Sequence, residues 1–304
     1  MRFQRLLLIV NPVARTFSKP VLAVIEKALS ADFRLEVTET KQRGHASEIA
    51  RQAMDGGIDL VVVFSGDGTI NEVLNALAGS DTALGVLPGG ATNILARALE
   101  LPLDPVEAAG VLISKALDDD AFKLNLGRAD GRYFAVNCGA GVDAAAMNRL
   151  DAKFPKKKSS FDRAAFRAVA WELLVGYAGR RADLTVTVDD AQPLAALSVM
   201  VGRTDPYTFY RGRGLRLTPE ASLDEGLDVL SVRKLARRAI PRIAWQVFGS
   251  ARHVHGRDID YVHDASHVLI TSEKKFPVQV DGDSMGDHHR LEVDLAREAL
   301  WVVA

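Results

Sequence analysis

Two glycine-rich segments of this 304-residue chain carry groups that could bind phosphate. The first is Ser65-Gly66-Asp67-Gly68-Thr69 and the second is Pro88-Gly89-Gly90-Ala91-Thr92-Asn93. Glycines let the main chain approach a ligand closely, and a hydroxyl or amide residue suits the start of a helix, whose amides and dipole favour anions. Asn11-Pro12 is a third, shorter candidate. Three such segments indicate a nucleotide site, although Gly, Asp and Thr also suit an ordinary turn before a helix.

These segments differ from the best-known phosphate-binding motifs. No Gly-Lys-Ser/Thr follows, so the pattern is not a P-loop, and the Gly-x-Gly-x-x-Gly dinucleotide pattern is absent too. A carboxylate at Asp67 would repel a bound phosphate unless Mg²⁺ or a hydrogen-bond donor lies between them.

The pattern of apolar residues predicts the elements that position these segments. In the first third, apolar runs typical of strands alternate with stretches of helical periodicity, which predicts an α/β domain with a buried parallel sheet. Ligands of such sheets bind beyond the carboxyl ends of the strands, where all three segments lie. The predicted strands are 6–10, 34–38, 60–64 and 84–87, and the predicted helices are 18–31, 46–54, 70–78 and 93–99.

Short strand signals dominate the rest of the chain and predict an antiparallel β-sandwich. We therefore expect two domains, residues 1–120 and 121–295, with the final strand at 300–303 bringing 296–304 back to the first. The predicted strands of the second domain are 123–127, 133–137, 184–188, 194–201, 227–232, 268–271, 278–280 and 291–293.

Composition excludes several classes of protein. Hydrophobic residues make up 48% and charged residues 25%, which excludes general disorder and collagen-like repeats, and the single cysteine excludes an internal disulfide. The net charge of −1 gives no indication of a nucleic-acid partner. No run approaches the ~18 apolar residues of a membrane span. We expect a cytoplasmic protein that at most lies on a membrane surface.

Two predicted helical stretches are strongly basic. Residues 145–182 carry a net charge of +6 and residues 233–257 a net charge of +7, and both interleave basic side chains, such as Lys156-Lys157-Lys158, with aromatic ones, such as Trp171 and Trp245. This mixture favours an anionic membrane surface. The alternative is an ordinary core stripe with a solvated charged face.

The motifs, in this order, resemble those of the bacterial diacylglycerol kinase and sphingosine kinase-like lipid kinases, which carry the diacylglycerol kinase catalytic domain. The resemblance covers nearly the whole chain. It rests on Asn11-Pro12, Gly44-His45-Ala46, the 65–69 segment followed by Asn71-Glu72, the 88–93 segment, the Pro-x-Ala-x-x-Asp-x-Gly pattern at 219–226, and Asp281-Gly282-Asp283 in place of Asp-Gly-Glu.

The resemblance implies transfer of phosphate from ATP, with Mg²⁺, to a lipid hydroxyl in an anionic membrane surface, with diacylglycerol as the expected lipid. It implies an NAD kinase/phosphofructokinase-like first domain and a β-sandwich second domain, and it is compatible with a homodimer. The implied catalytic residues are Asp281 as general base, Asp283 and Asp67. The implied nucleotide-binding residues are Asn11, Thr40, His45, Ser65, Gly66, Asp67, Gly68, Thr69, Glu72, Gly90, Thr92 and Asn93.

This chain departs from the family pattern at several positions. Ser65 replaces a glycine, Ala91 replaces a threonine, and Asp283 replaces a glutamate. The family's structural Mg²⁺ implies a metal site at Asp224, Glu225 and Asp228, but the spacing here is one residue short.

Two other functions remain open. One is an NAD kinase-like small-molecule kinase, which shares the Gly-Asp-Gly core. The other is a catalytically impaired lipid-binding regulator, for which Ala91 and Asp283 are the only support. Without the resemblance, Asp281-Gly282 would be interpreted as a simple turn.

Overall fold

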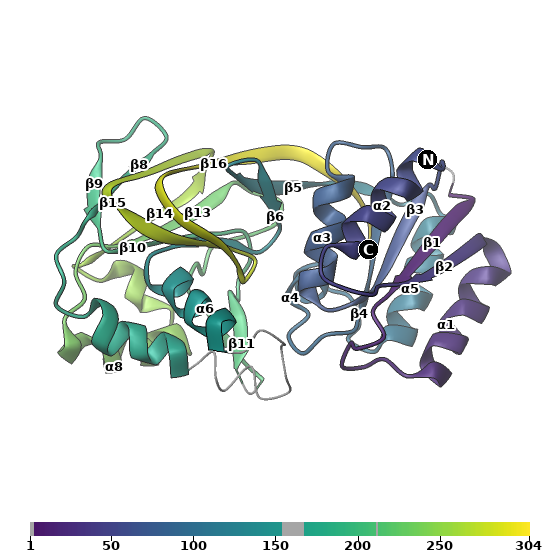
Figure 1. The fold of residues 1–304 in the computed structure, drawn as a ribbon, viewed down its shortest axis with the longest axis horizontal. Coiled ribbons are helices and arrows are strands. Elements are labelled where there is room, and N and C mark those ends of the chain that lie inside the picture. Colours follow the sequence, from purple (N-terminus) through teal and green to yellow (C-terminus); the bar gives the residue numbers. More distant parts are fainter. Residues whose placement is uncertain (1–2, 154–166, 211) are drawn as a thin grey trace. The chain divides into compact units, whose positions relative to one another are not determined.

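The computed structural model describes residues 3–153, 167–210 and 212–304 (Figure 1). The lysine run at 156–158 and the aromatic residues Phe161 and Phe166 lie outside them. The chain forms two compact units, one of Met1–Leu126 with Ala296–Ala304 and the other of Gly127–Leu295. The first unit therefore extends six residues beyond the predicted boundary at residue 120.

The first unit contains a parallel sheet in the order β4-β3-β1-β2, with the end of β16 beside β4. Helices α1 and α5 contact each other, as do α2 and α3. The strands are β1 (Arg5–Val10), β2 (Arg34–Glu39), β3 (Leu60–Ser65) and β4 (Ala83–Pro88), and the helices are α1 (Lys19–Asp32), α2 (His45–Asp55), α3 (Asp67–Leu77), α4 (Ile94–Ala98) and α5 (Pro105–Leu117).

The sheet is buried on both faces, as its apolar strands predict. In β1, Leu6 and Leu8 pack in a core with Ile25 of α1 and Leu112 of α5, while Leu7 is buried on the opposite face. Alternate residues of a strand point to opposite faces, so a strand that is apolar throughout needs cover on both sides. The predicted α/β domain is confirmed.

Two helices differ from the sequence prediction. Helix α5 was not predicted, although the Asp104 carboxylate caps it and Pro105 occupies its first turn. Helix α3 begins at Asp67 rather than at 70, because extended Gly66 serves as its N-cap and its carbonyl accepts from the Ile70 N–H (3.2 Å). Most of the 65–69 segment is therefore the first turn of a helix.

The second unit is an antiparallel β-sandwich, as predicted. One path runs β14-β13-β10-β7-β15-β16, β8 pairs with β15 and β9, and β5 pairs with β16 and β6. The strands are β5 (Phe122–Ala129), β6 (Arg132–Phe134), β7 (Asn137–Ala140), β8 (Leu184–Val188), β9 (Leu194–Ala196), β10 (Ser198–Gly202), β11 (Thr208–Tyr210), β12 (Arg213–Leu215), β13 (Leu227–Val232), β14 (Ile259–Ala265), β15 (His267–Val280) and β16 (Asp283–Val303).

Among the described elements, strand β16 is the longest, and it belongs to both units. This strand has 21 residues. Its first part pairs with β15, and at its end Val302 and Val303 pair with Leu84 and Gly85 of β4. The short strands predicted at 291–293 and 300–303 are thus parts of one strand.

In the first basic stretch, the described residues 145–153 and 167–177 are helical, whereas the second stretch is less helical than predicted. The first contains α6 (Val142–Lys153) and the π-helical segment η1 (Glu172–Tyr177). The second breaks into η2 (Arg237–Ala239), α8 (Ile240–Val247) and η3 (Arg252–His255), because Ala251 adopts a positive φ and Gly249 follows α8. None of the helices that the structure describes is long and apolar enough to cross a membrane.

Candidate active site

The predicted nucleotide residues gather at one edge of the first unit's sheet. Asn11, Thr40, Ser65 and Gly89 lie at or directly after the carboxyl ends of β1 to β4. Strand β1 lies between β2 and β3, so the chain leaves it toward one side for β2 and returns to the other side for β3. Such a topological switch point is where open α/β sheets bind ligands.

Side chains of two segments are joined at this switch point. The Asn11 Nδ2–H group donates to Thr69 Oγ1 (3.3 Å), and the Ser65 hydroxyl donates to the same oxygen (2.8 Å). Ser65, which departs from the family's glycine, thus fixes the Thr69 hydroxyl at the first turn of α3. The Asn11 Oδ1 atom accepts from the Val13 N–H (3.1 Å), which fixes the turn after β1.

The two glycine-rich segments meet main chain to main chain. A Cβ atom at Gly66 would lie 3.1 Å from the Gly90 Cα, and one at Gly89 would lie 2.8 Å from the Ser65 Cα. Gly68 differs, because a Cβ there would meet nothing within 4 Å. The segments therefore pack closely at Gly66, Gly89 and Gly90 and leave the space beside Gly68 open.

Asp67 is directed toward the second segment. Its carboxylate accepts from the Thr92 hydroxyl (2.9 Å) and from the Leu95 N–H (3.4 Å) at the start of α4. Burial raises the pKa of the Asp67 carboxyl, and these hydrogen bonds oppose that rise. In this arrangement the Asp67 carboxylate joins the two segments. Asn93 completes the second segment, because its Oδ1 accepts from the Gly90 N–H (2.7 Å).

Glu72, His45 and Thr40 form the side of the site next to α2. The Glu72 carboxylate accepts from the Gly44 N–H (2.8 Å) and the Ala46 N–H (3.2 Å), so it caps the start of α2. His45 is the first residue of α2, and its Nδ1 accepts from the Lys41 N–H (3.1 Å). The Thr40 N–H donates to the Val10 carbonyl (2.8 Å). The structure thus brings all the predicted nucleotide residues to one edge of the first unit.

In the second unit, Asp281 lies in a tight hairpin turn. Asp281 and Gly282 both have positive φ, 47° and 78°, and they connect β15 to β16. Two consecutive positive φ values are typical of a type I′ turn, for which Asp-Gly is a favoured pair. The turn that the residues alone suggested is therefore present. It does not exclude a chemical role.

Three main-chain amides hold the Asp281 carboxylate. Oδ1 accepts from the Val136 and Asn137 N–H groups (3.1 and 2.9 Å), and Oδ2 accepts from the Ala135 N–H (3.2 Å). The Asp281 N–H in turn donates to the Asn137 carbonyl (2.9 Å). The cradle 135–137 therefore holds the carboxylate at a fixed position.

Residues near this turn form a polar network that the sequence did not reveal. Asp283 pairs with Arg132 (3.0 Å). Buried Gln279 donates from Nε2 to Asn137 Oδ1 (2.6 Å) and accepts at Oε1 from the Gly282 N–H (2.8 Å). The sequence feature that could have indicated this network is the presence of a polar residue, Asn137 or Gln279, within each of two apolar runs.

A buried carboxyl group adjoins this network. The Tyr207 hydroxyl donates to Asp143 Oδ1 (2.8 Å). Burial raises the pKa of Asp143 to about 6, although the hydrogen bond from Tyr207 opposes the rise. Burial beside Asp143 also raises the pKa of Tyr207 well above its usual value, so the tyrosine remains a hydrogen-bond donor.

Family models match both units. The diacylglycerol kinase catalytic domain matches residues 5–121, and the YegS C-terminal NAD kinase beta sandwich-like domain matches residues 136–303, more than half of the chain. The chain belongs to the diacylglycerol kinase family of lipid kinases. The resemblance found in the sequence motifs is thereby confirmed.

Named relatives of this lipid kinase align along most of its length. It is 27% identical to "Diacylglycerol kinase" of Bacillus subtilis (strain 168), over 93% of this chain and 91% of that protein. It is also 27% identical to the diacylglycerol kinase of Staphylococcus haemolyticus, over 92% and 82% of the two chains. A crystal structure of a diacylglycerol kinase from Bacillus anthracis str. Sterne has the same fold, with a TM-score of 0.72, 24% identity, and 100% and 97% of the two chains covered.

The predicted metal residues of this lipid kinase do not form one cluster. Asp228 is buried, and its carboxylate accepts from the Tyr261 hydroxyl and contacts His263 Nδ1 (2.8 Å). Glu225 Oε2 lies 3.5 Å from His263 Nε2, and Asp224 is exposed. Among the described residues, three potential metal ligands come within 4.8 Å of one another only at His267, Glu292 and Asp294.

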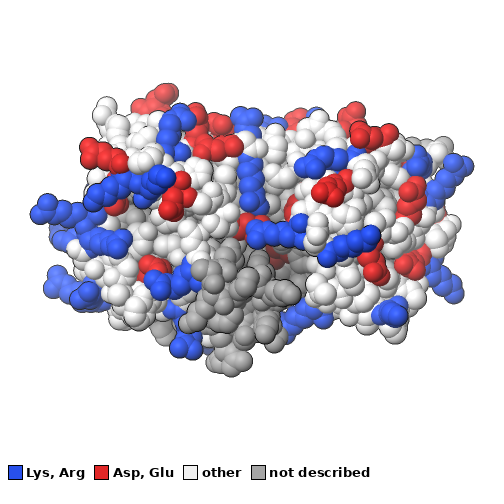
Figure 2. Space-filling view, viewed as in Figure 1, with Lys and Arg blue, Asp and Glu red and all other residues white. Residues whose placement is uncertain are grey.

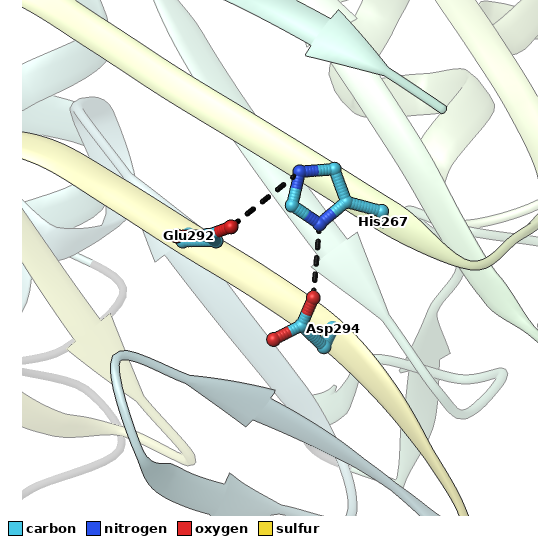
Figure 3. A group of neighbouring side chains, drawn as sticks. All are labelled: His267, Glu292 and Asp294. Carbon is cyan, nitrogen blue, oxygen red and sulfur yellow. Dashed lines mark hydrogen bonds and ion pairs between the residues drawn. The ribbon is translucent and has the colours of Figure 1, made fainter. Parts of the chain in front are cut away.

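That cluster is an ion-pair network on β15 and β16 (Figure 3). The His267 ring lies between the two carboxylates, with Nδ1 2.9 Å from Asp294 and Nε2 3.8 Å from Glu292. Each carboxylate also pairs with an arginine, Asp294 with Arg128 (3.2 Å) and Glu292 with Arg290 (2.7 Å). The cationic groups already balance the carboxylates, so the cluster does not indicate a metal.

Proposed function

We propose that this lipid kinase transfers the γ-phosphate of ATP to a lipid hydroxyl, with diacylglycerol as the acceptor. The observation that carries the proposal is the contact between the two glycine-rich segments at the switch point, beside the open space at Gly68. The segment that contains Gly68 is also the start of an eleven-residue helix, whose first main-chain amides suit a phosphate chain.

The proposed chemistry is mainly positioning and charge neutralisation. The Thr69 hydroxyl, fixed by Asn11 and Ser65, and the amides of α3 would orient the phosphates. Mg²⁺ accompanying ATP would neutralise charge that develops on the transferring group. Asp67 would contribute by keeping the two segments in register through Thr92.

Asp281 is the proposed acceptor of the hydroxyl proton. A nucleophilic hydroxyl needs a base within hydrogen-bond reach as it attacks phosphorus. The amide cradle 135–137 restricts the carboxylate to one orientation. Because a carboxylate has about four lone-pair directions, a substrate hydroxyl can share it with these amides. Asp283, held by Arg132, would contribute negative charge nearby without moving.

Diacylglycerol is proposed as the phosphate acceptor because the similar proteins are named diacylglycerol kinases.

The sandwich unit also presents apolar side chains suited to a membrane surface. Trp245 on α8 is 80% exposed, and Trp171, Leu174 and Val175 in the preceding basic stretch are exposed too. The two stretches are in contact, because Arg237 Nε donates to the Leu174 carbonyl (3.3 Å).

The distribution of charged side chains supports binding to membranes through the two basic stretches rather than through the whole surface. On the face drawn in Figure 2, Lys and Arg side chains alternate with Asp and Glu side chains. The excess of basic residues lies in the two stretches, where Arg237, Arg238 and Arg242 precede the exposed Trp245. Exposed tryptophan beside arginine is typical of peripheral binding to anionic lipid.

Purified protein, γ-labelled ATP and Mg²⁺ should be incubated with a panel of diacylglycerol, phosphatidylglycerol and a sphingoid base in mixed micelles, and separately with NAD. We expect label on diacylglycerol and none on NAD. Label on NAD would instead support the small-molecule kinase, and ATP binding without transfer to any lipid would support the impaired regulator.

A variant links the activity to the proposed nucleotide site. Gly68→Val places a side chain in the open space. Because a Cβ atom at this position meets no neighbouring atom within 4 Å, we expect the variant to fold. We expect the KM for ATP to rise about tenfold or more. An unchanged KM for ATP would place the nucleotide elsewhere.

A further inference from the structure

Arg203 is the largest fully buried side chain of the described residues, with no exposed surface. It follows β10, and its guanidinium lies against the segment 223–226. Nη1 donates to the carbonyls of Glu225 and Gly226 and Nη2 donates to the carbonyl of Leu223, each at 2.5 Å. A buried cation thus binds three main-chain oxygens of one loop.

Convergent main-chain oxygens are typical ligands of hard cations such as Mg²⁺ and Ca²⁺. The carbonyls of Leu223, Glu225 and Gly226 belong to the very segment in which the sequence implied a structural Mg²⁺. We propose that the Arg203 guanidinium is the resident cation of this loop and replaces that metal ion, so that the second unit folds without a bound metal.

The surrounding side chains fit this replacement and do not fit an additional metal. The Asp228 carboxylate is occupied by Tyr261 and His263, and the Glu225 side chain turns to His263. A guanidinium stays charged at all ordinary pH values, so a second cation against the same carbonyls would be repelled. The loop offers a place for one cation, and Arg203 fills it.

Arg203 also connects this loop to the cradle of Asp281. The Arg203 N–H donates to the Val136 carbonyl (2.8 Å), and the Val136 N–H donates to Asp281 Oδ1 (3.1 Å). A single residue, Val136, therefore links the main chain of Arg203 to the carboxylate. Anchoring Arg203 at both ends ties segment 223–226 to residues 135–137, so Arg203 is a positioning residue.

The first test uses the full chain with its natural sequence and no nucleotide. After purification in the presence of divalent cations and then desalting, metal content is measured by mass spectrometry, and the melting temperature is measured with and without excess EDTA. We expect less than about a tenth of an equivalent of Mg²⁺ or Ca²⁺ and no shift of the melting temperature with EDTA. One equivalent of either ion, or destabilisation by EDTA, would overturn the proposal.

The second test removes the guanidinium. Arg203→Met keeps most of the length of the side chain but leaves three buried carbonyls without a donor, so the melting temperature should fall by about 5–10 °C. Arg128→Met is the matched control, because it removes an arginine of the same unit that makes a partly exposed ion pair with Asp294. Equal melting temperatures for Arg203→Met and the control would overturn the proposal. The first test stands independently if Arg203→Met does not fold.

Discussion

Gly66 and Gly90 lie in contact through their main chains. A Cβ atom at Gly90 would lie 2.7 Å from the Gly66 Cα, and one at Gly66 would lie 3.1 Å from the Gly90 Cα. The distance of 2.7 Å is shorter than two non-bonded carbon atoms tolerate, and the atom that the added Cβ would meet belongs to the main chain. The two segments that follow β3 and β4 can therefore meet only because both positions lack a side chain.

Gly90→Ala should consequently damage both stability and nucleotide binding. The added methyl group must displace the 65–69 segment, which we expect to lower the free energy of unfolding by about 1–3 kcal/mol and to weaken ATP binding measured by calorimetry. Gly110→Ala in α5 is the matched control, because its Cβ meets nothing within 4 Å. The packing argument would be contradicted if Gly90→Ala were as stable as the control and bound ATP as tightly.

Asp281→Asn tests the proposed base. Asparagine keeps the size of the side chain, but its amide group cannot take up the hydroxyl proton, and its NH2 group cannot accept the hydrogen bond that one carboxylate oxygen receives from the cradle 135–137. We expect kcat to fall by about 10²- to 10⁴-fold with little change in the KM for ATP. The exposed Asp190→Asn substitution is the control. If Asp281→Asn retains the natural kcat, the general base lies elsewhere.

Asp143 should make the stability depend on pH. Burial raises its pKa to about 6 in the folded chain, above the value of about 3.9 in an unfolded chain. Between these values the folded state binds more protons, so the contribution of Asp143 to stability falls as the pH rises through this range. Above pH ~6 the accumulated loss approaches about 3 kcal/mol.

Asp143→Asn removes this titration. We expect the melting temperature of the variant, relative to the natural protein, to increase between about pH 4.5 and pH 7. Asp190→Asn should show no such trend. A constant difference between Asp143→Asn and the natural protein across this range would show that Asp143 does not titrate there.

Trp245→Ala tests the proposed membrane surface. Removing a large, exposed aromatic side chain from α8 should reduce binding to vesicles that contain phosphatidylglycerol by about tenfold, without lowering the melting temperature. Val13→Ala is the control, because Val13 is 87% exposed in the first unit. Sedimentation with anionic and with zwitterionic vesicles measures the effect. Equal losses for the two variants would argue against a specific role for α8.

The sequence predicted the first unit well because local signals agree there. Apolar runs such as Leu60–Ser65 are long, and glycine and asparagine mark their ends. Helix α5 was missed although Asp104 and Pro105 mark its start. In the second unit, strand β14 (Ile259–Ala265) was missed, because most of its positions are only partly buried or exposed and its sequence includes Asp260, His263 and Asp264.

The candidate site was predictable in its residues but not in their partners. Motif order located Asp281 and Asp67, whereas the amides that hold Asp281 come from about 145 residues earlier in the chain. Motif order did not indicate that the carboxylate of Asp67 accepts a hydrogen bond from Thr92. The sequence did not predict the role of Arg203, because its guanidinium binds main-chain carbonyls, which every residue type carries. Contacts between distant segments are what local patterns cannot reveal.

The course of β16 has a consequence for the order of synthesis. Residues 302 and 303 are made after the whole second unit, yet they complete the sheet of the first beside Leu84 and Gly85. While the nascent chain grows, β4 therefore presents an unpaired edge, and such edges promote aggregation. The sheet of the amino-terminal unit is therefore complete only after residues 302 and 303 have been synthesised and have paired with β4.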